Sequence, residues 1–171
     1  MASATQEPRY EVVREYGGFE VREYAPFVVA EVVVPGPAEA AGSRGFRILA
    51  SYIFGKNDGA QKISMTAPVI QTPAEGAYVV QFTMPREYRL ETLPAPLDSR
   101  VDFREVSGGR FAVIRYSGSW SEDNYKSHLE QLERDVRSAG LRTTGAPIYA
   151  RYNAPYVPSF MRRNEIWLEL E

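Results

Sequence analysis

The same order of predicted elements occurs twice along this chain, and this repetition constrains its fold more than any other feature of the sequence. Alternating apolar residues and helical spacing predict strand–strand–helix–strand–strand from about residue 19 to 84, and again from about 99 to 171. Residues 85–98, with three prolines among polar residues, are expected to link the two repeats. Thr66-Ala67-Pro68 and Asn153-Ala154-Pro155 occupy corresponding places in them.

The repetition predicts an α+β fold. One repeat can cover only one face of its sheet with one helix, so two repeats related by a pseudo-twofold axis would close a shared core. We therefore expect a distorted β-barrel built from two strand–strand–helix–strand–strand repeats. Residues 9–171 would form a single domain, and residues 1–8 a short flexible lead.

Individual elements follow from local signals. Gly17-Gly18 is expected to form a type I′ turn, and Gly108-Gly109 a second turn. Ser119 and Glu122 resemble a capping box that starts a helix ending at Gly140, with an apolar stripe of Tyr125, Leu129, Leu132, Val136 and Ala139. The other predicted elements are strands Tyr10 to Tyr16, Phe19 to Tyr24, Phe27 to Val34, Ile63 to Ile70, Tyr78 to Thr83, Val101 to Val106, Phe111 to Tyr116, Ile148 to Tyr152 and Glu165 to Leu170, and a helix from Ala38 to Phe54.

Composition excludes several classes of function. The 171 residues carry a net charge of −2, which gives no reason to expect a nucleic-acid partner. There is no cysteine and one histidine, His128, so thiolate chemistry and multi-histidine metal sites are absent. The longest apolar run, Phe27 to Val34, is too short to span a membrane, and the N-terminus does not resemble a secretory signal, so we expect a cytoplasmic protein. No nucleophile–base set or phosphate-binding glycine loop is present, so we do not expect an enzyme. Acid–base catalysis by two carboxylates that lie close together in space remains an open alternative.

The first helix carries more apolar surface than one buried face needs. Phe46, Leu49, Ala50 and Ile53 share one side at 100° per residue. Ile48 and Tyr52 fall on the other side, beside Arg44, with Arg47 on the flank. This surplus predicts a binding surface whose arginines receive carboxylates. The alternative is that a loop covers Ile48 and Tyr52.

Residues 153–164 form an unusually apolar loop. Two prolines interrupt any strand there, yet the segment carries Tyr156, Val157, Phe160 and Met161 before Arg162-Arg163. Since loops are ordinarily polar, this composition suits a lid over a flat apolar molecule with acidic groups. The alternative is a loop folded onto the core, with its arginines paired to nearby acids.

Several separated motifs in this chain resemble the SOUL/haem-binding protein family. They are Tyr10-Glu11-Val12-Val13, Phe19-Glu20-Val21-Arg22, the run from Gly45 to Asn57, Ile63 to Val69, Asn153-Ala154-Pro155 and Arg162 to Ile166. The resemblance extends from about residue 9 to the end of the chain.

The resemblance implies a protein that binds haem or another tetrapyrrole reversibly, as a carrier or buffer. The ligand would lie in a shallow apolar groove between the first helix and the loop before the last strand. By position, Ile48 and Tyr52 would contact the ring, as would Tyr156, Phe160 and Met161 of the loop, and the propionates would meet Arg44, Arg47, Arg162 and Arg163. The family's histidine ligand has no counterpart in the first helix, and His128 lies on the second helix, where a local hydrogen bond is expected instead. Met65, Met84 and Met161 are weaker candidates for an iron ligand.

Two other functions remain open. The fold also resembles effector-binding domains of bacterial regulators, which would take cationic or drug-like ligands through a buried carboxylate, here Glu31 or Glu165. A module that binds a partner helix or peptide is the other. A preference for cationic ligands would favour the effector-binding domain over the tetrapyrrole hypothesis. A bound ligand that absorbs visible light would argue against the peptide-binding module.

Overall fold

Two units make up the part of the chain that the computed structural model describes, residues 5–171. Unit 1 contains Pro26–Ser107 and the described residues up to Pro8, and unit 2 contains Arg9–Ala25 and Gly108–Glu171. Each consists of one α-helix and an antiparallel sheet, so the predicted α+β class is confirmed. Of the expected lead, residues 1–4 lie outside the described residues, and Gln6 is bonded within unit 1, where its side-chain oxygen accepts from the Arg86 backbone at 3.0 Å.

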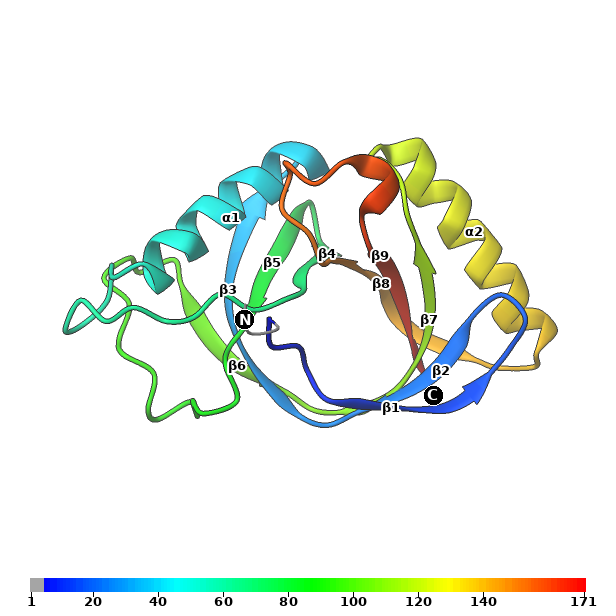
Figure 1. The fold of residues 1–171 in the computed structure, drawn as a ribbon, viewed down its shortest axis with the longest axis horizontal. Helices are drawn as coiled ribbons and strands as arrows, with labels where there is room; N and C mark the ends of the chain where they lie inside the picture. Colours follow the sequence, from blue (N-terminus) through cyan, green and yellow to red (C-terminus); the bar gives the residue numbers. More distant parts are fainter. Residues whose placement is uncertain (1–4) are drawn as a thin grey trace. The chain divides into compact units, whose positions relative to one another are not determined.

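Unit 1 is a four-stranded sheet covered by α1 (Ala38–Ile53). Its strand order is β4-β5-β3-β6, and Figure 1 shows α1 along β3 and β5. The strands are β3 (Phe27–Pro35), β4 (Val69–Ala74), β5 (Ala77–Thr83) and β6 (Asp102–Val106). The core between helix and sheet contains Val32 and Val80 from the strands and Leu49 and Ile53 from the helix.

The buried face of α1 is rotated relative to the prediction. Ile48 and Tyr52, expected on the outer side, are buried, whereas Phe46 is 38% exposed. The physical reason is Gly45, where an added Cβ would lie 2.6 Å from a methyl group of Val80. A glycine there lets the helix approach β5 closely, and this approach selects the side that packs on the sheet.

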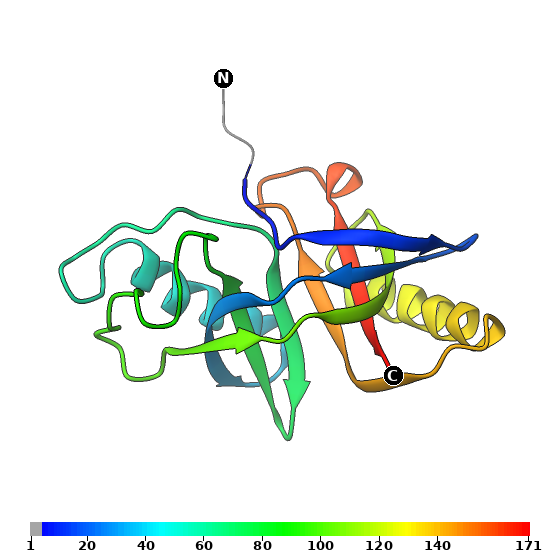
Figure 2. The same cartoon turned by 90° about the horizontal axis from the view of Figure 1, so that it is seen from below.

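Unit 2 is a five-stranded sheet with α2 (Glu122–Ser138) on one face. The strand order is β1-β2-β7-β9-β8, and Figure 2 shows β1 and β2 side by side as a hairpin. The strands are β1 (Tyr10–Glu15), β2 (Glu20–Tyr24), β7 (Gly109–Tyr116), β8 (Thr143–Arg151) and β9 (Asn164–Leu170). Leu132 and Val136 of α2 are buried against the sheet, as the apolar stripe predicts.

Both sheets place corresponding strands in the same order. In unit 1 the order is β4-β5-β3-β6, and in unit 2 the corresponding series is β8-β9-β7-β2. The first strand of each predicted repeat therefore joins the sheet formed by the other repeat: β2 pairs with β7, and β6 pairs with β3. This correspondence supports an internal duplication, which stays a prediction, as does the single-domain boundary at residue 9.

Three turn and capping predictions are wrong in detail. Neither Gly17 nor Gly18 has positive φ, so the β1–β2 connection is not a type I′ turn, and the chain closes it with a bond from Tyr16 N to Phe19 O at 2.8 Å. Gly108-Gly109 closes no hairpin, because β6 and β7 pair with other strands. The N-cap of α2 is Ser121, two residues after the predicted Ser119, and it accepts from Asn124 N.

The strand expected at Ile63 to Ile70 begins only at Val69. Residues 63–66 lie outside the ladder, and their side chains do not keep the predicted alternation: Ile63 is buried, whereas Met65, two positions later, is 41% exposed. Pro68 cannot donate a ladder hydrogen bond, and the Thr66 hydroxyl donates to the Thr83 carbonyl instead.

Candidate functional site

A buried carboxylate, Glu165, organises the polar side chains of unit 2. Its Oε1 accepts from Nη1 of Arg22 at 2.8 Å and its Oε2 from Nη2 of the same residue at 3.0 Å. This bidentate ion pair joins β9 to β2, two strands that are not neighbours in the sheet, and both side chains are almost fully buried. Such pairs combine charge with planar geometry, so they fix orientation as well as contributing energy.

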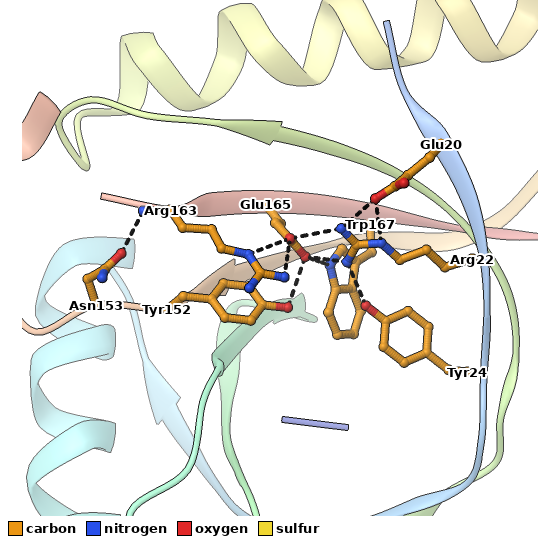
Figure 3. Close-up of polar contacts among 8 residues, drawn as sticks. All are labelled: Glu20, Arg22, Tyr24, Tyr152, Asn153, Arg163, Glu165 and Trp167. Carbon is orange, nitrogen blue, oxygen red and sulfur yellow. Dashed lines mark hydrogen bonds and ion pairs between the residues drawn. The ribbon is translucent and has the colours of Figure 1, made fainter. Parts of the chain in front are cut away.

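Three further side chains donate to the same carboxylate (Figure 3). The Tyr152 hydroxyl donates at 2.9 Å, the Trp167 indole at 2.8 Å, and Nε of Arg163 at 2.9 Å. With Arg22, these donors occupy the places at which a carboxylate accepts hydrogen bonds. We call Glu165, Arg22, Tyr152, Arg163 and Trp167 the Glu165 cluster.

Strand alternation explains why this cluster lies on one face of the sheet. Alternate residues of a strand point to opposite faces, so Glu165 and Trp167 share a face, and Ile166 and Leu168 share the other. The second face packs on α2 as part of the unit 2 core. Arg22 belongs to the first face, and its guanidinium also bonds to Glu20 and to the Tyr24 hydroxyl.

The cluster keeps Glu165 ionised. Burial by itself would raise the pKa of this carboxyl, but the hydrogen bonds and charges of Arg22 and Arg163 outweigh burial and hold the pKa below its usual value. The same burial, with the Glu165 charge beside it, raises the pKa of Tyr152. Glu165 is therefore an acceptor of hydrogen bonds in this structure, and as a carboxylate it has no proton to donate.

The apolar loop, residues 153–163, is exposed, as the lid hypothesis requires. Tyr156 is 88% exposed, Phe160 76% and Met161 63%. A short 3-10 helix, η1 (Ser159–Met161), shapes its second half. The loop is thus a surface of large apolar side chains, and the alternative in which these side chains fold onto the core is wrong.

The two arginines after the loop are engaged inside unit 2. Arg163 pairs with Glu165 and lies over the Tyr152 ring, with its guanidinium carbon 3.8 Å from the ring centroid. Arg162 donates to two backbone carbonyls of the loop, those of Val157 and Pro155. The alternative in which these arginines pair with nearby acids is therefore observed for Arg163, whereas Arg162 donates to backbone carbonyls. Neither points its donors at a free carboxylate, so their predicted role as propionate contacts is not supported by this geometry.

The helix residues of the predicted groove divide into exposed and covered ones. Arg44 and Arg47 are exposed on α1. Tyr52 is buried, and its hydroxyl donates to the carbonyl of Pro94 at 2.7 Å, within the segment expected to be a linker. The alternative that a loop covers these residues is therefore observed for Tyr52, whereas Ile48 is buried in the unit 1 core. The helix and the apolar loop belong to different units, and the groove expected between them stays a prediction.

His128 has the local hydrogen bond that the sequence led us to expect. Its Nδ1 donates to the Asn124 carbonyl at 2.7 Å, and its ring stacks on Tyr116 with centroids 4.0 Å apart. The other acid considered for a cationic ligand, Glu31, accepts from Gln81 and from Arg104. Of the methionines considered as iron ligands, Met84 is buried, whereas Met65 and Met161 are exposed.

Sequence reasoning missed Arg22, Tyr152 and Trp120 as parts of this region. A signal existed for the first: Glu20, Arg22 and Tyr24 put polar residues on one face of a strand whose other face carries Val21. For Tyr152 and Trp120 no local pattern was available, because their partners lie elsewhere in the chain. Trp120 donates to Oδ1 of Asn164 at 2.9 Å.

Residues 5–171 contain neither a cluster of potential metal ligands nor a helix that could span a membrane. No group of three or more His, Asp or Glu side chains is arranged to hold a metal ion. None of the helices described there is long and apolar enough to cross a membrane.

Comparison with known sequences identifies one family along nearly the whole chain. A family model described as SOUL heme-binding protein matches residues 5–169. Human heme-binding protein 2 is 32% identical over 161 residues, covering 89% of this chain and 78% of that protein. Heme-binding protein 1 of Xenopus tropicalis is 29% identical over 158 residues, covering 87% and 82%.

Solved structures with low sequence identity share the fold. A cryo-EM structure of an EcmrR–DNA complex gives a TM-score of 0.67 at 13% identity, covering 88% of this chain and 56% of that one. A crystal structure described as a hydrolase from Listeria innocua gives 0.64 at 13% identity, covering 91% and 94%. The structure of SAV2435 bound to tetraphenylphosphonium gives 0.51 at 11% identity, covering 90% and 93%.

Proposed function

This chain belongs to the SOUL heme-binding protein family, and from that premise we propose that it binds haem or a related tetrapyrrole reversibly through its apolar loop, as a carrier or buffer. The observation that carries the proposal is the exposure of Tyr156, Phe160 and Met161 on one short loop. Large apolar side chains in water cost free energy that burial against a ligand would recover, at about 25 cal/mol per Å². Haem, the ligand in the family's description, is a flat and largely apolar macrocycle of the kind that these side chains could cover.

The side chains of the loop fit such a ligand. Aromatic rings favour offset stacking on a planar π-system, and a thioether makes soft contacts with ring edges. Haem supplies an iron centre that can take up axial ligands, together with strong visible absorption. This chain's part is to hold the ring against apolar side chains, and nothing in the loop requires an iron–histidine bond.

Arg44 and Arg47 are the proposed partners of the ligand's carboxylates. Both lie exposed on α1, less than one helical turn apart, and the resemblance assigns propionate contacts to both. A guanidinium binds a carboxylate through two parallel hydrogen bonds. Their contribution is separable from that of the loop, because it depends on the ligand's charge.

A cationic ligand is less well supported. One similar fold is described with tetraphenylphosphonium, and a buried carboxylate is what would attract such a cation. Glu165 is buried, but it already accepts from two guanidinium groups, those of Arg22 and Arg163. A third cation would have to displace one of them from a dry site, which costs several kcal/mol. A function as an enzyme has no supporting observation either, and likeness to a hydrolase at 13% identity concerns the fold alone.

The test is a titration with hemin and with metal-free protoporphyrin IX, followed at the Soret band and by tryptophan quenching. We expect saturable one-to-one binding of both ligands. Replacing Phe160 and Met161 by serine should weaken both at least tenfold. Val33→Ser, which changes an apolar side chain 59% exposed in unit 1, is the matched control and should change neither. Failure of the natural chain to bind either ligand would overturn the proposal.

A further inference from the structure

Arg162 makes contacts that a ligand-binding arginine would not need. Its Nε donates to the carbonyl of Val157 at 3.0 Å, and its Nη2 donates to the carbonyl of Pro155 at 2.9 Å. These two carbonyls flank Tyr156, which is 88% exposed. The guanidinium therefore holds the backbone on both sides of the most exposed aromatic residue of the loop.

The other side of the guanidinium lies against Trp120. The guanidinium carbon is 4.1 Å from the centroid of the indole ring, a cation–π distance. Trp120 is itself fixed, because its indole nitrogen donates to Asn164 at the start of β9. Arg162 thus joins the loop to the connection that precedes α2.

The remaining loop backbone is tied down in the same region. Gly118 N donates to the carbonyl of Ser159 at 2.9 Å, and Tyr152 N donates to the carbonyl of Arg163 at 3.2 Å, closing the neck of the loop. Met161 N donates to the carbonyl of Pro158 at 2.9 Å. The backbone of the loop is held while its large side chains stay in water, and this combination is typical of a preorganised contact surface.

We propose that Arg162 is a positioning residue: it fixes the shape in which the loop presents Tyr156, Phe160 and Met161, and it does not bind the carboxylates of the ligand. This role rests on the proposed tetrapyrrole binding and deepens it. It differs from the propionate contact that the resemblance implies for the same residue. Preorganisation lowers the entropy lost on binding, so its removal weakens any ligand that uses the loop, whatever the ligand's charge.

Ligand charge provides the test. The ligands are protoporphyrin IX, which has two carboxylates, and its dimethyl ester, which has none, both delivered from dimethyl sulfoxide. The variants are Arg162→Gln, which removes the charge, and Arg162→Lys, which keeps it but cannot bridge two carbonyls and stack on an indole. We expect both variants to weaken both ligands by a similar factor, about fivefold to twentyfold.

Controls separate this role from a loss of folding. Arg142→Gln changes an exposed arginine of unit 2 outside the loop and should alter neither affinity. Circular dichroism should remain unchanged in the Arg162 variants, whereas acrylamide quenching of tryptophan emission should increase, because Trp120 loses its cover and Trp167 stays buried.

The outcomes are distinguishable. Equal losses for diacid and diester, with Lys no better than Gln, support the positioning role. A loss confined to the diacid and restored by Lys would overturn that role and leave the proposed function standing. Unchanged affinity in both variants would also overturn it. Failure of the natural chain to bind either porphyrin would remove the proposed function, and the role of Arg162 with it.

Discussion

Arg22 and Glu165 lie 143 residues apart in the chain and form a bidentate ion pair with N–O distances of 2.8 and 3.0 Å, with about 1% or less of either side chain exposed. The pair connects β2 to β9 across β7, and it is the centre from which Tyr152, Arg163 and Trp167 are oriented. Since Arg163 closes the neck of the apolar loop, this ion pair links the core of unit 2 to the exposed side chains of that loop.

Glu165→Gln should destabilise the protein by about 3–5 kcal/mol, because it removes the buried negative charge that the guanidinium groups of Arg22 and Arg163 share, although Arg22 keeps its ion pair with Glu20. Urea unfolding followed by circular dichroism measures this. Glu31→Gln is the control: Glu31 also pairs with an arginine, Arg104, but that side chain is 56% exposed, so the expected cost is about 0–1 kcal/mol. Equal losses of stability in the two variants would show that the buried ion pairs of Glu165 contribute no more to stability than the exposed pair of Glu31 does.

Gly45→Ala should lower stability even though alanine favours helices by about 1 kcal/mol. The new Cβ would lie 2.6 Å from a Val80 methyl group, and overpacking of this kind typically costs about 1–3 kcal/mol. Val80→Ala should relieve the clash, so the double variant is expected to be more stable than the sum of the single effects. Additive effects in thermal unfolding would show that the close approach of α1 to β5 does not require glycine.

Stability should fall as the pH rises above about 10. Burial raises the pKa of five tyrosines in the folded chain: Tyr24, Tyr52, Tyr116, Tyr149 and Tyr152. Above pH 10, the ordinary value for tyrosine, the unfolded chain loses these protons while the folded chain keeps them, so the free energy of unfolding decreases. Each such tyrosine contributes about 1.4 kcal/mol per pH unit.

Absorbance of tyrosinate at 295 nm provides the measurement. Of the eleven tyrosines in the chain, these five should ionise together with the loss of circular dichroism, and in urea all eleven should titrate near pH 10. Titration of all eleven near pH 10 in a chain that stays folded would refute the assigned burial.

His128→Gln should leave the Soret maximum and affinity of bound hemin unchanged within about twofold. The His128 imidazole stacks on Tyr116 and donates to Asn124, so it serves local packing, and its loss should cost about 1 kcal/mol of stability. A shifted Soret maximum together with lost hemin binding would instead identify this histidine as an iron ligand.

The sequence was informative where one local pattern decides the outcome. The stripe on α2 and the C-terminal ends of both helices follow from 3.6-residue periodicity and from Gly55 and Gly140, which take positive φ after the helices. The exposed apolar loop also follows from composition, because Pro155 and Pro158 exclude a strand.

Prediction failed where the deciding contact is distant in the chain. Nothing near Tyr52 reveals that the carbonyl of Pro94 accepts a hydrogen bond from its hydroxyl, so the sequence alone predicts a binding surface on α1. In the same way, no local pattern indicates that Arg162 stacks on Trp120, 42 positions earlier in the sequence, or that it donates to backbone carbonyls of the loop. Every residue has a backbone carbonyl, so the sequence does not show which carbonyl will accept a hydrogen bond. A charged side chain before a strand therefore suggests a ligand contact more readily than a role in positioning a loop.

The most direct test of tetrapyrrole binding by the apolar loop is residue-resolved NMR of the ¹⁵N-labelled chain, titrated with paramagnetic hemin and with diamagnetic zinc protoporphyrin IX. We predict that hemin selectively broadens the amide signals of Tyr156, Phe160 and Met161, and that the zinc porphyrin shifts the same signals without broadening them. Broadening centred on α2 around His128, with the loop signals unaffected, would contradict the account.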